Sequence, residues 1–152
     1  MLERVGGTRG SQLFEFALVL PLLCMLLVGM LFGGILLYDY VTLADAVAAG
    51  ARVLATERGA NTTGSDLSKD ACALAAQMVQ ASAASLNTGA PSALTVPTPT
   101  FTGSGGSTCP NLVEGDWGTV TATYACSVPI PFTTVNLCPT GGITSSTTMR
   151  IE

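Results

Sequence analysis

The chain has 152 residues, of which 48% are hydrophobic and 11% are charged, and its mean hydropathy is +0.51. It carries six basic and ten acidic residues, a net charge of −4, and no histidine. The length suits one domain of ordinary size. The acidic balance repels phosphate and argues against nucleic-acid binding. The absence of histidine removes the commonest general base and a common zinc ligand.

The hydrophobic excess is concentrated in residues 16–38, a run without a single charged side chain. As a helix this run reaches about 34 Å, which crosses a bilayer core of roughly 30 Å. It lacks the polar stripe of a helix at the surface of a soluble domain. It is too long for the apolar core of a cleaved signal peptide, and no small-residue cleavage site closes it. Lipid attachment at Cys24 is not expected because the bulky Leu23 precedes it, so Cys24 is predicted to act as a small apolar residue. The run therefore predicts one transmembrane helix.

A lone carboxylate, Glu15, lies at the edge of this helix. A charge within hydrocarbon costs about 2.5–3.5 kcal/mol on insertion scales, so such a residue suggests a function and a partner. Cleavage between Gly10 and Ser11 would create an α-amino group one helical turn from Glu15. The amine of a neighbouring subunit displaced along the axis could pair with this carboxylate. The alternative is that Glu15 simply rests among the lipid headgroups.

Two further features of the span concern helix geometry. Pro21 removes one backbone donor and is expected to bend or loosen the helix. Gly29 and Gly33 form a GxxxG pattern, which lets transmembrane helices approach closely, although glycine-rich spans contain this pattern by chance.

The charges that flank the span predict its orientation. Arg4 and Arg9 precede it, whereas Asp39 and Asp45 follow it, so positive-inside counting places the N-terminus in the cytoplasm. The domain beyond the span contains an even number of cysteines, as disulfide-stabilised exported domains do. These are Cys72, Cys109, Cys126 and Cys138. Four cysteines allow three pairings, and the sequence does not choose among them. Reduced thiols remain an alternative, whereas a zinc site is disfavoured because there is no CxxC spacing.

Beyond the span, the chain first continues as an alanine-rich helix to about residue 55, and a turn cluster at residues 59–64 ends it. This stretch is expected to pack against the protein's own sheet. A second helix is predicted over residues 66–86, with Ser65 or Asp66 as N-cap and Asn87 or Gly89 at its end. Its apolar face is predicted at helical spacing. That face comprises Leu67, Ala71, Leu74, Met78 and residues 82 and 86.

The sequence from residue 90 onward is rich in threonine, valine, proline and glycine. Residues 93–101 predict an edge or broken strand because Pro97 and Pro99 interrupt it. Residues 103–106 are expected to form a flexible loop. Residues 117–128 and 143–151 alternate as two clear strands. Glu114 and Asp116 supply too few oxygens for calcium and are expected to be solvated charges. The predicted fold class is therefore α+β, with two helices and a small antiparallel sheet of about three strands.

The segment 9–55 resembles the TadE-like pseudopilins of tight-adherence (Tad) pilus systems, which are related to type IV prepilins. The resemblance rests on Gly10, then Glu15 with Phe16, then a Leu-Pro step ending at Pro21, and finally an Ala/Gly-Ala-Arg segment at residues 48–52. It implies cleavage after Gly10 by a prepilin peptidase, with Ser11 as the new N-terminus and Glu15 and Phe16 in subunit alignment. It also implies assembly with other pilins, a secretion ATPase and a membrane platform. Because major pilins of the family are shorter, the chain is expected to be a minor pseudopilin.

The expected organisation is a leader at 1–10, a transmembrane helix at 11–38, its extracytoplasmic continuation at 39–60 and an α+β domain at 61–152. The predicted location is the bacterial inner membrane, with the domain extracytoplasmic and possible entry into an extracellular pilus. Partners are the membrane, the peptidase and other pilins, in a possible homo-oligomer or filament, without cofactor, metal or nucleic acid. No catalytic constellation or phosphate-binding loop is found, so an enzyme is not expected. The alternative function is a signal-anchored binding module whose exposed sheet recognises a ligand, with no role in a filament.

Overall fold

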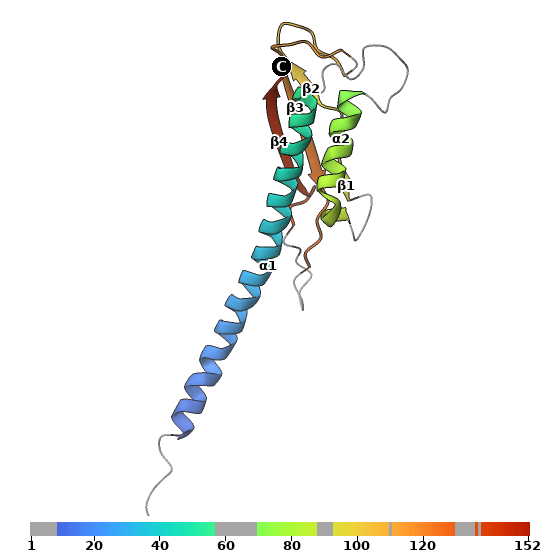
Figure 1. The fold of residues 1–152 in the computed structure, drawn as a ribbon. Helices are drawn as coiled ribbons and strands as arrows, with labels where there is room; N and C mark the ends of the chain where they lie inside the picture. Colours follow the sequence, from blue (N-terminus) through green and yellow to red (C-terminus); the bar gives the residue numbers. More distant parts are fainter. Residues whose placement is uncertain (1–8, 57–69, 88–92, 110, 130–135, 137) are drawn as a thin grey trace, which may run out of the picture. The chain divides into compact units, whose positions relative to one another are not determined.

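The computed structural model describes residues 9–56, 70–87, 93–109, 111–129, 136 and 138–152 (Figure 1). The chain divides into two compact units, Met1–Leu37 and Tyr38–Glu152. Helix α1, Arg9–Thr56, contributes residues to both units. The predicted helical continuation beyond the apolar run is confirmed and ends at Thr56. The expected turn cluster at 59–64 lies outside the described residues.

In the second unit, α1 buries one face through residues spaced by three and four. The buried residues are Leu43, Ala46, Val47, Gly50, Ala51, Leu54 and Ala55. This spacing keeps them on one side of a helix with 3.6 residues per turn. Alanine and glycine dominate the set, so other elements can approach the α1 backbone closely. The expected packing of this alanine-rich stretch inside its own domain is confirmed.

Helix α2, Ala71–Ser82, begins at Asp70, whose side chain accepts a hydrogen bond from the Cys72 backbone N–H at 3.1 Å. An N-cap carboxylate satisfies a donor that the helix itself leaves unpaired. A short 3₁₀ turn, η2, follows at Ala84–Asn87. The predicted N-caps Ser65 and Asp66 lie outside the described residues, as does Gly89.

The predicted buried face of this segment is confirmed at Ala71 and at Leu86 in η2, but it is wrong at Leu74 and Met78. The structure buries Ala71, Cys72, Ala75 and Val79, whereas Leu74 is half-buried and Met78 is 42% exposed. The reason lies on α1. A Cβ atom added to Gly50 would lie 2.9 Å from the carbonyl oxygen of Ala75 and would also collide with Val79. Such a close crossing requires small side chains at the contact and moves the larger Leu74 and Met78 to its margin.

A four-stranded antiparallel sheet completes the second unit. Its strands are β1 (Leu94–Thr95), β2 (Thr100–Thr102), β3 (Trp117–Tyr124) and β4 (Ile143–Arg150). β3 is central: β4 pairs with its full length, β1 pairs with its end at Thr123 and Tyr124, and β2 pairs with its start at residues 117–119. β1 and β2 are thus two pieces of one broken edge on either side of Pro97 and Pro99. The predicted interruption is confirmed, and it makes four strands rather than about three.

The two long strands alternate as predicted. Gly118, Val120 and Ala122 of β3 are buried, whereas Thr119, Thr121 and Thr123 are half-exposed on the other side. β4 begins at the buried Ile143 and then alternates exposed and half-buried residues up to the buried Ile151. β3 ends at Tyr124 instead of reaching residue 128. The α+β prediction is confirmed, with α1 and α2 on one face of the sheet (Figure 1).

Two disulfides resolve the pairing that the sequence left open. Cys72 at the start of α2 pairs with Cys109 in the loop after β2, and Cys126 pairs with Cys138 after β3. The second loop is further closed by Asn136, whose side-chain oxygen accepts hydrogen bonds from the backbone N–H groups of Val128 at 3.0 Å and Cys138 at 3.1 Å. The first bridge therefore ties a loop to α2, and the second closes the segment that follows β3.

Candidate functional site

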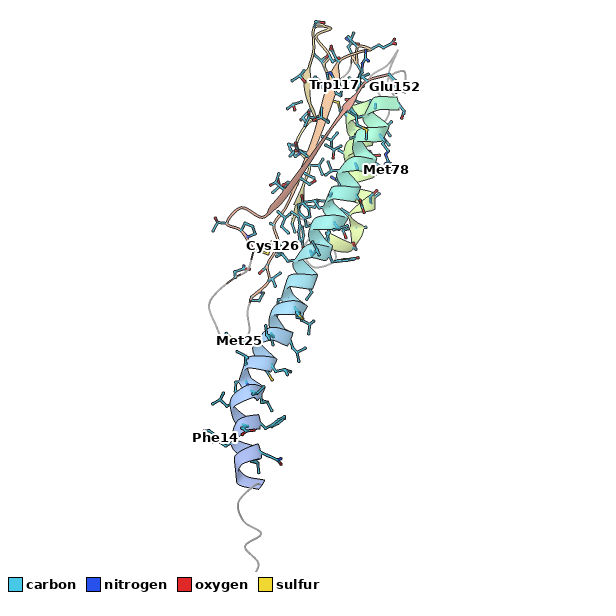
Figure 2. All side chains as sticks on the ribbon, turned by 90° about the vertical axis from the view of Figure 1, so that its left-hand side faces the viewer. Phe14, Met25, Met78, Trp117, Cys126 and Glu152 are labelled. Carbon is cyan, nitrogen blue, oxygen red and sulfur yellow. A yellow bond between two sulfur atoms is a disulfide. The ribbon has the colours of Figure 1, made fainter. Side chains whose placement is uncertain are left out.

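The first unit of the chain contains one helix, whose described side chains, from Gln12 to Leu37, are all exposed or half-exposed. Within Gln12–Thr56, the most apolar window of 18 residues has a mean hydropathy of 2.6, and none of it is buried. The side chains of Phe14 and Met25 project from the helix surface and are 72% and 78% exposed (Figure 2). This helix is long and apolar enough to cross a membrane, and it is a candidate membrane anchor. The core helix of a soluble domain would instead be largely buried.

The predicted processing bond joins Gly10 to Ser11. Both residues lie in the first turn of α1, which begins at Arg9, and only their backbone is described. Glu15 follows four residues after Ser11, about 6 Å further along the helix axis. Glu15 and Phe16 are both exposed, and Phe16 is 66% accessible. The helix therefore exposes a carboxylate and an aromatic ring at consecutive positions, which point about 100° apart around its axis.

The other predicted residues of the span lie on the same uncovered helix. Pro21 falls inside α1, which continues through it without interruption. A Cβ atom built on Gly29 or Gly33 meets nothing within 4 Å, so the described chain covers neither glycine. Cys24 is exposed and takes part in neither disulfide. Glu15, Pro21, Gly29 and Gly33 therefore all lie on one helix within the first unit.

Aromatic and acidic side chains mark the beginning of the second unit. Tyr38 and Tyr40 are 60% and 50% exposed. Tyrosines are enriched where a transmembrane helix leaves the hydrocarbon, because the ring is apolar and the hydroxyl is polar. Burial raises the pKa of the Asp39 carboxyl, and burial together with the Asp39 charge raises the pKa of the Tyr124 phenol. The end of β3 therefore lies within electrostatic reach of the residue that follows the candidate anchor.

Asp116 is a site that sequence reasoning missed, since it was expected to be a solvated charge. It is only 4% exposed. Its carboxylate accepts hydrogen bonds from the Gly105 N–H at 3.0 Å, the Ser107 N–H at 3.1 Å and the Ser107 hydroxyl at 2.7 Å. The Ser107 hydroxyl, then the Gly105 N–H, hold the pKa of Asp116 below its usual range. Residues 103–106 were expected to form a flexible loop, but Gly105 of this loop and the adjacent Ser107 donate hydrogen bonds to the Asp116 carboxylate.

The backbone around Asp116 also extends the sheet. Its carbonyl accepts from the Ile151 N–H at 2.8 Å, and the Ile151 carbonyl accepts from the Gly115 N–H at 3.0 Å. One residue thus connects the glycine loop with the end of β4. This arrangement fits a structural role for Asp116. Among the residues that the structure describes, no group of three or more His, Cys, Asp or Glu side chains could hold a metal ion.

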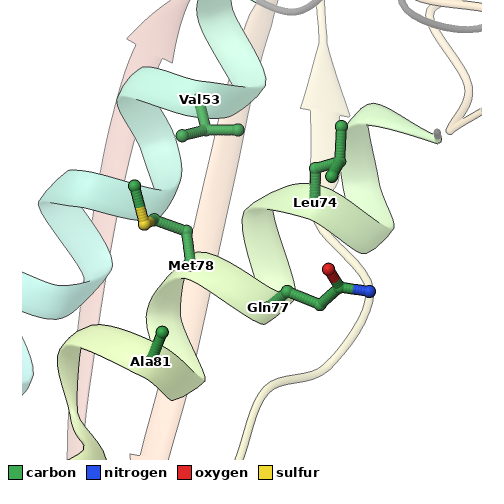
Figure 3. A pocket seen from close by; sticks show the side chains of 5 residues that line it. All are labelled: Val53, Leu74, Gln77, Met78 and Ala81. Atoms are coloured by element: carbon green, nitrogen blue, oxygen red, sulfur yellow. The ribbon is translucent and has the colours of Figure 1, made fainter. Parts of the chain in front are cut away.

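A shallow groove of about 360 Å³ lies between α1 and α2 on the second unit (Figure 3). Met78 reaches from α2 toward α1 near Val53, and Leu74, Gln77 and Ala81 complete the lining. The lining contains no ionisable side chain, so the groove offers neither a general acid nor a general base. The groove exists because α1 and α2 contact each other closely at Gly50, which leaves Leu74 and Met78 at the margin of the contact.

Comparison with known protein families gives one match. Residues 10–52 match the model of the TadE-like protein family, and the match ends at Arg52. It covers Gly10, Glu15, Pro21 and Gly50, but less than a third of the 152 residues. The resemblance stated from the sequence is thereby confirmed for this segment. No curated protein and no solved structure matches the chain.

Proposed function

Residues 10–52 form a TadE-like segment, and from this premise we propose that the chain is a processed minor pseudopilin of a Tad-type adhesive pilus. Prepilin peptidase would cleave after Gly10 and leave Ser11 as the mature N-terminus. The helix would remain in the inner membrane, with the disulfide-bonded unit on the extracytoplasmic side, until the subunit joins the pilus or its base. Other pilins, the assembly ATPase and its membrane platform would be its partners.

One observation carries this proposal: the segment that matches the family is the uncovered apolar helix that contains Gly10 and Glu15. An exposed apolar surface must be covered by lipid or by other helices, since its transfer out of water is favourable by roughly 25 cal/mol per Å². In a pilin-like subunit, lipid would cover this apolar helix in the membrane, and the helices of neighbouring subunits would cover it after assembly. The glycines at positions 29 and 33 leave room for a neighbouring helix.

The proposal assigns a structural role, and it explains why the chain carries a stable exported unit beside its helix. The two disulfides and the contact between the sheet and residues 43–55 of α1 belong to the second unit, and no residue of the candidate anchor before Leu43 is among its buried core residues. Disulfides of this kind persist in oxidising compartments outside the cytoplasm. They support an extracytoplasmic location for residues 72–138.

The first experiment is expression with and without the cognate prepilin peptidase, followed by intact mass and N-terminal sequencing. We expect a peptidase-dependent form that begins at Ser11. A Gly10→Val variant should remain uncut because the bulky side chain blocks access to the bond. A Gly6→Val variant within the leader is the matched control and should still be cut. If the leader stays attached in the presence of peptidase, the chain is better explained as a signal-anchored binding module.

A further inference from the structure

The sheet of the second unit has an outer face that is turned away from α1. A Cβ atom added to Gly118 would lie 2.9 Å from the Leu54 side chain of α1, so the side of β3 that carries Gly118 faces the helix. The odd-numbered residues of β3 point to the opposite side, because side chains alternate along a strand. In the antiparallel register, the even-numbered residues of β4 share this outer side. The outer side chains are half-exposed or exposed in β3 and exposed in β4.

Side chains with a hydroxyl group make up most of this outer face. On the two long strands they form a set that we call the hydroxyl face: Thr119, Thr121, Thr123, Thr144, Ser146 and Thr148. Thr95 of β1 and Thr100 of β2 extend the set across the sheet. Among the strand residues that the structure describes, Arg150 is the only charged one. The face therefore offers a partner hydrogen bonds rather than charge.

The hydroxyl groups hold one another in place. Thr119 Oγ1 and Thr148 Oγ1 lie 2.8 Å apart. Thr123 Oγ1 and Thr144 Oγ1 lie 3.2 Å apart. Each pair uses one donor and one acceptor between its members, so one O–H donor and further acceptor lone pairs remain for a ligand. Threonine is also stiff at χ1, so ordering these side chains on binding costs little entropy.

An exposed indole and a pocket lie at one end of the hydroxyl face. Trp117 is 49% exposed, and its Cα partner across the sheet is Arg150. Arg150 also lines a pocket of about 330 Å³ together with Glu114, Ile151 and Glu152. Trp117 and Glu152 lie at the same end of the sheet (Figure 2). This end therefore combines an aromatic surface with a guanidinium and two carboxylates.

These features together fit the chemistry of a carbohydrate. A sugar ring has an apolar C–H side that packs on an indole, whose π face is electron-rich. Its hydroxyl groups both donate and accept, as those of the hydroxyl face do. The guanidinium and carboxylates of the pocket can make charge-assisted hydrogen bonds to sugar hydroxyls. An apolar peptide would instead meet Trp117 as the one large apolar side chain that the described strands place on this side, and it would cover hydroxyls without pairing them.

We propose that the hydroxyl face, Trp117 and the pocket at Arg150 bind a neutral polysaccharide, with one sugar ring stacked on Trp117 and the following rings over the hydroxyl face. Glu114, Glu152 and the net charge of −4 disfavour an anionic polysaccharide. The site goes beyond the pseudopilin assignment and does not depend on it, because every residue involved belongs to the second unit.

Retention on insoluble polysaccharides tests the proposal. The full chain in detergent micelles is passed over cellulose, chitin and β-mannan, which carry no acidic groups, and over alginate beads, which are anionic. We expect retention on at least one neutral polymer, release by a soluble oligosaccharide of the same sugar, and no retention on alginate. Retention on none of the neutral polymers, or on alginate alone, would overturn the proposal.

Trp117→Ala tests the stacking contact. Because truncation of an aromatic anchor removes the main contact of a binding site, the affinity should fall by roughly tenfold or more. Tyr40→Ala is the matched control, since Tyr40 is 50% exposed but lies on α1 rather than on the sheet. The Tm of each variant shows whether its second unit is folded. Unchanged affinity in folded Trp117→Ala, or an equal loss in Tyr40→Ala, would contradict the site.

The double variant T119V/T148V tests the hydroxyl face. Valine retains the branched shape and the strand preference of threonine while removing the hydroxyl group. Losing the hydrogen bonds of this pair to the sugar should weaken retention by about two- to tenfold. Thr42→Val is the control, because the Thr42 hydroxyl donates to the Tyr38 carbonyl on α1 at 2.8 Å. Wild-type affinity in T119V/T148V would remove the hydroxyl face from the site.

Discussion

Gly50 is the residue at which α1 meets α2. An added Cβ would press on the Ala75 carbonyl oxygen at 2.9 Å and on Val79, and these neighbours belong to a backbone and to a buried side chain. Neither can move without disturbing the core. The same position lies inside the segment that matches the TadE-like family, two residues before its end at Arg52.

A Gly50→Ala variant should therefore destabilise the second unit despite the better helix propensity of alanine. Overpacking costs about 1–3 kcal/mol, while the gain in propensity is about 1 kcal/mol. A net loss of about 1 kcal/mol would lower Tm by roughly 4–8 °C for a domain of this size. Gly34→Ala is the matched control, because a Cβ there meets nothing within 4 Å. Thermal unfolding in detergent compares the Tm values of the two variants. Equal values would contradict the close contact between α1 and α2 at Gly50.

Asp116 gives the second prediction at this scale. Because its pKa is lowered on folding, its contribution to stability is present above the ordinary aspartate value near 4 and is lost as the pH falls through the folded value. The Tm difference between the wild-type chain and D116N should therefore be constant at neutral pH and shrink below about pH 4. E152Q removes one exposed carboxylate and serves as the control for net charge. A difference that grows toward acid pH would contradict the hydrogen-bonded carboxylate.

At the scale of elements, the irregular segments are tied to the regular ones by covalent bonds. The Cys72–Cys109 bridge closes a sequence separation of 37 residues and fixes the start of α2, whereas the Cys126–Cys138 bridge closes only 12. The loop-entropy relation gives about 4 and about 3 kcal/mol for loops of these sizes. The contributions are comparable, but the longer bridge also holds a helix that covers the core.

Replacing each pair by alanines tests this ranking. C72A/C109A should lower the free energy of unfolding more than C126A/C138A, by about 1 kcal/mol from the loop lengths alone. Chemical denaturation of the two variants beside the oxidised wild-type chain provides the comparison. Retention of wild-type stability in both variants would show that the bridges form only after the unit is already stable without them.

The elements that sequence could predict are those whose pattern is local. The apolar run of α1, the alternation of Val120 and Ala122 in β3 and the break at Pro97 each follow from neighbouring residues. The buried face of α2 could not be predicted, because it depends on Gly50, which is distant in sequence. The role of Asp116 was missed for a different reason: its partners Gly105 and Ser107 are near in sequence, but the contact depends on how the intervening loop folds back. A glycine-rich loop with a serine, close in sequence to an aspartate, was the available signal.

At the scale of the whole molecule, the proposed function separates assembly from folding. Glu15 and Phe16, which the resemblance assigns to subunit alignment, are exposed on the candidate anchor, while the core lies among Leu43, Val47, Val120 and Ile151 of the second unit. A substitution of an exposed residue in the candidate anchor should leave the core of the second unit intact. The two roles can therefore be measured independently on one protein.

Glu15→Ala is the direct test of this separation. We expect it to abolish co-purification with the assembled pilus while leaving the Tm of the second unit and both disulfides unchanged, because Glu15 belongs to the first unit and the buried core residues belong to the second. Gln12→Ala, one turn earlier on the same exposed helix, should leave incorporation intact. Normal incorporation of the Glu15→Ala chain would remove the proposed role in subunit alignment and favour a plain membrane anchor.

The return of the chain to α1 after β4 has a consequence for biosynthesis. Ile151 is buried in the core that α1 begins, and the Glu152 N–H donates to the Ala55 carbonyl at 3.3 Å. The inner face of α1 therefore leaves the ribosome long before its covering strand has been made. Contacts between segments so distant in sequence form slowly. Until β4 has been made, the inner face of α1 lacks part of its cover, and we expect the second unit to become stable only once β4 has joined it.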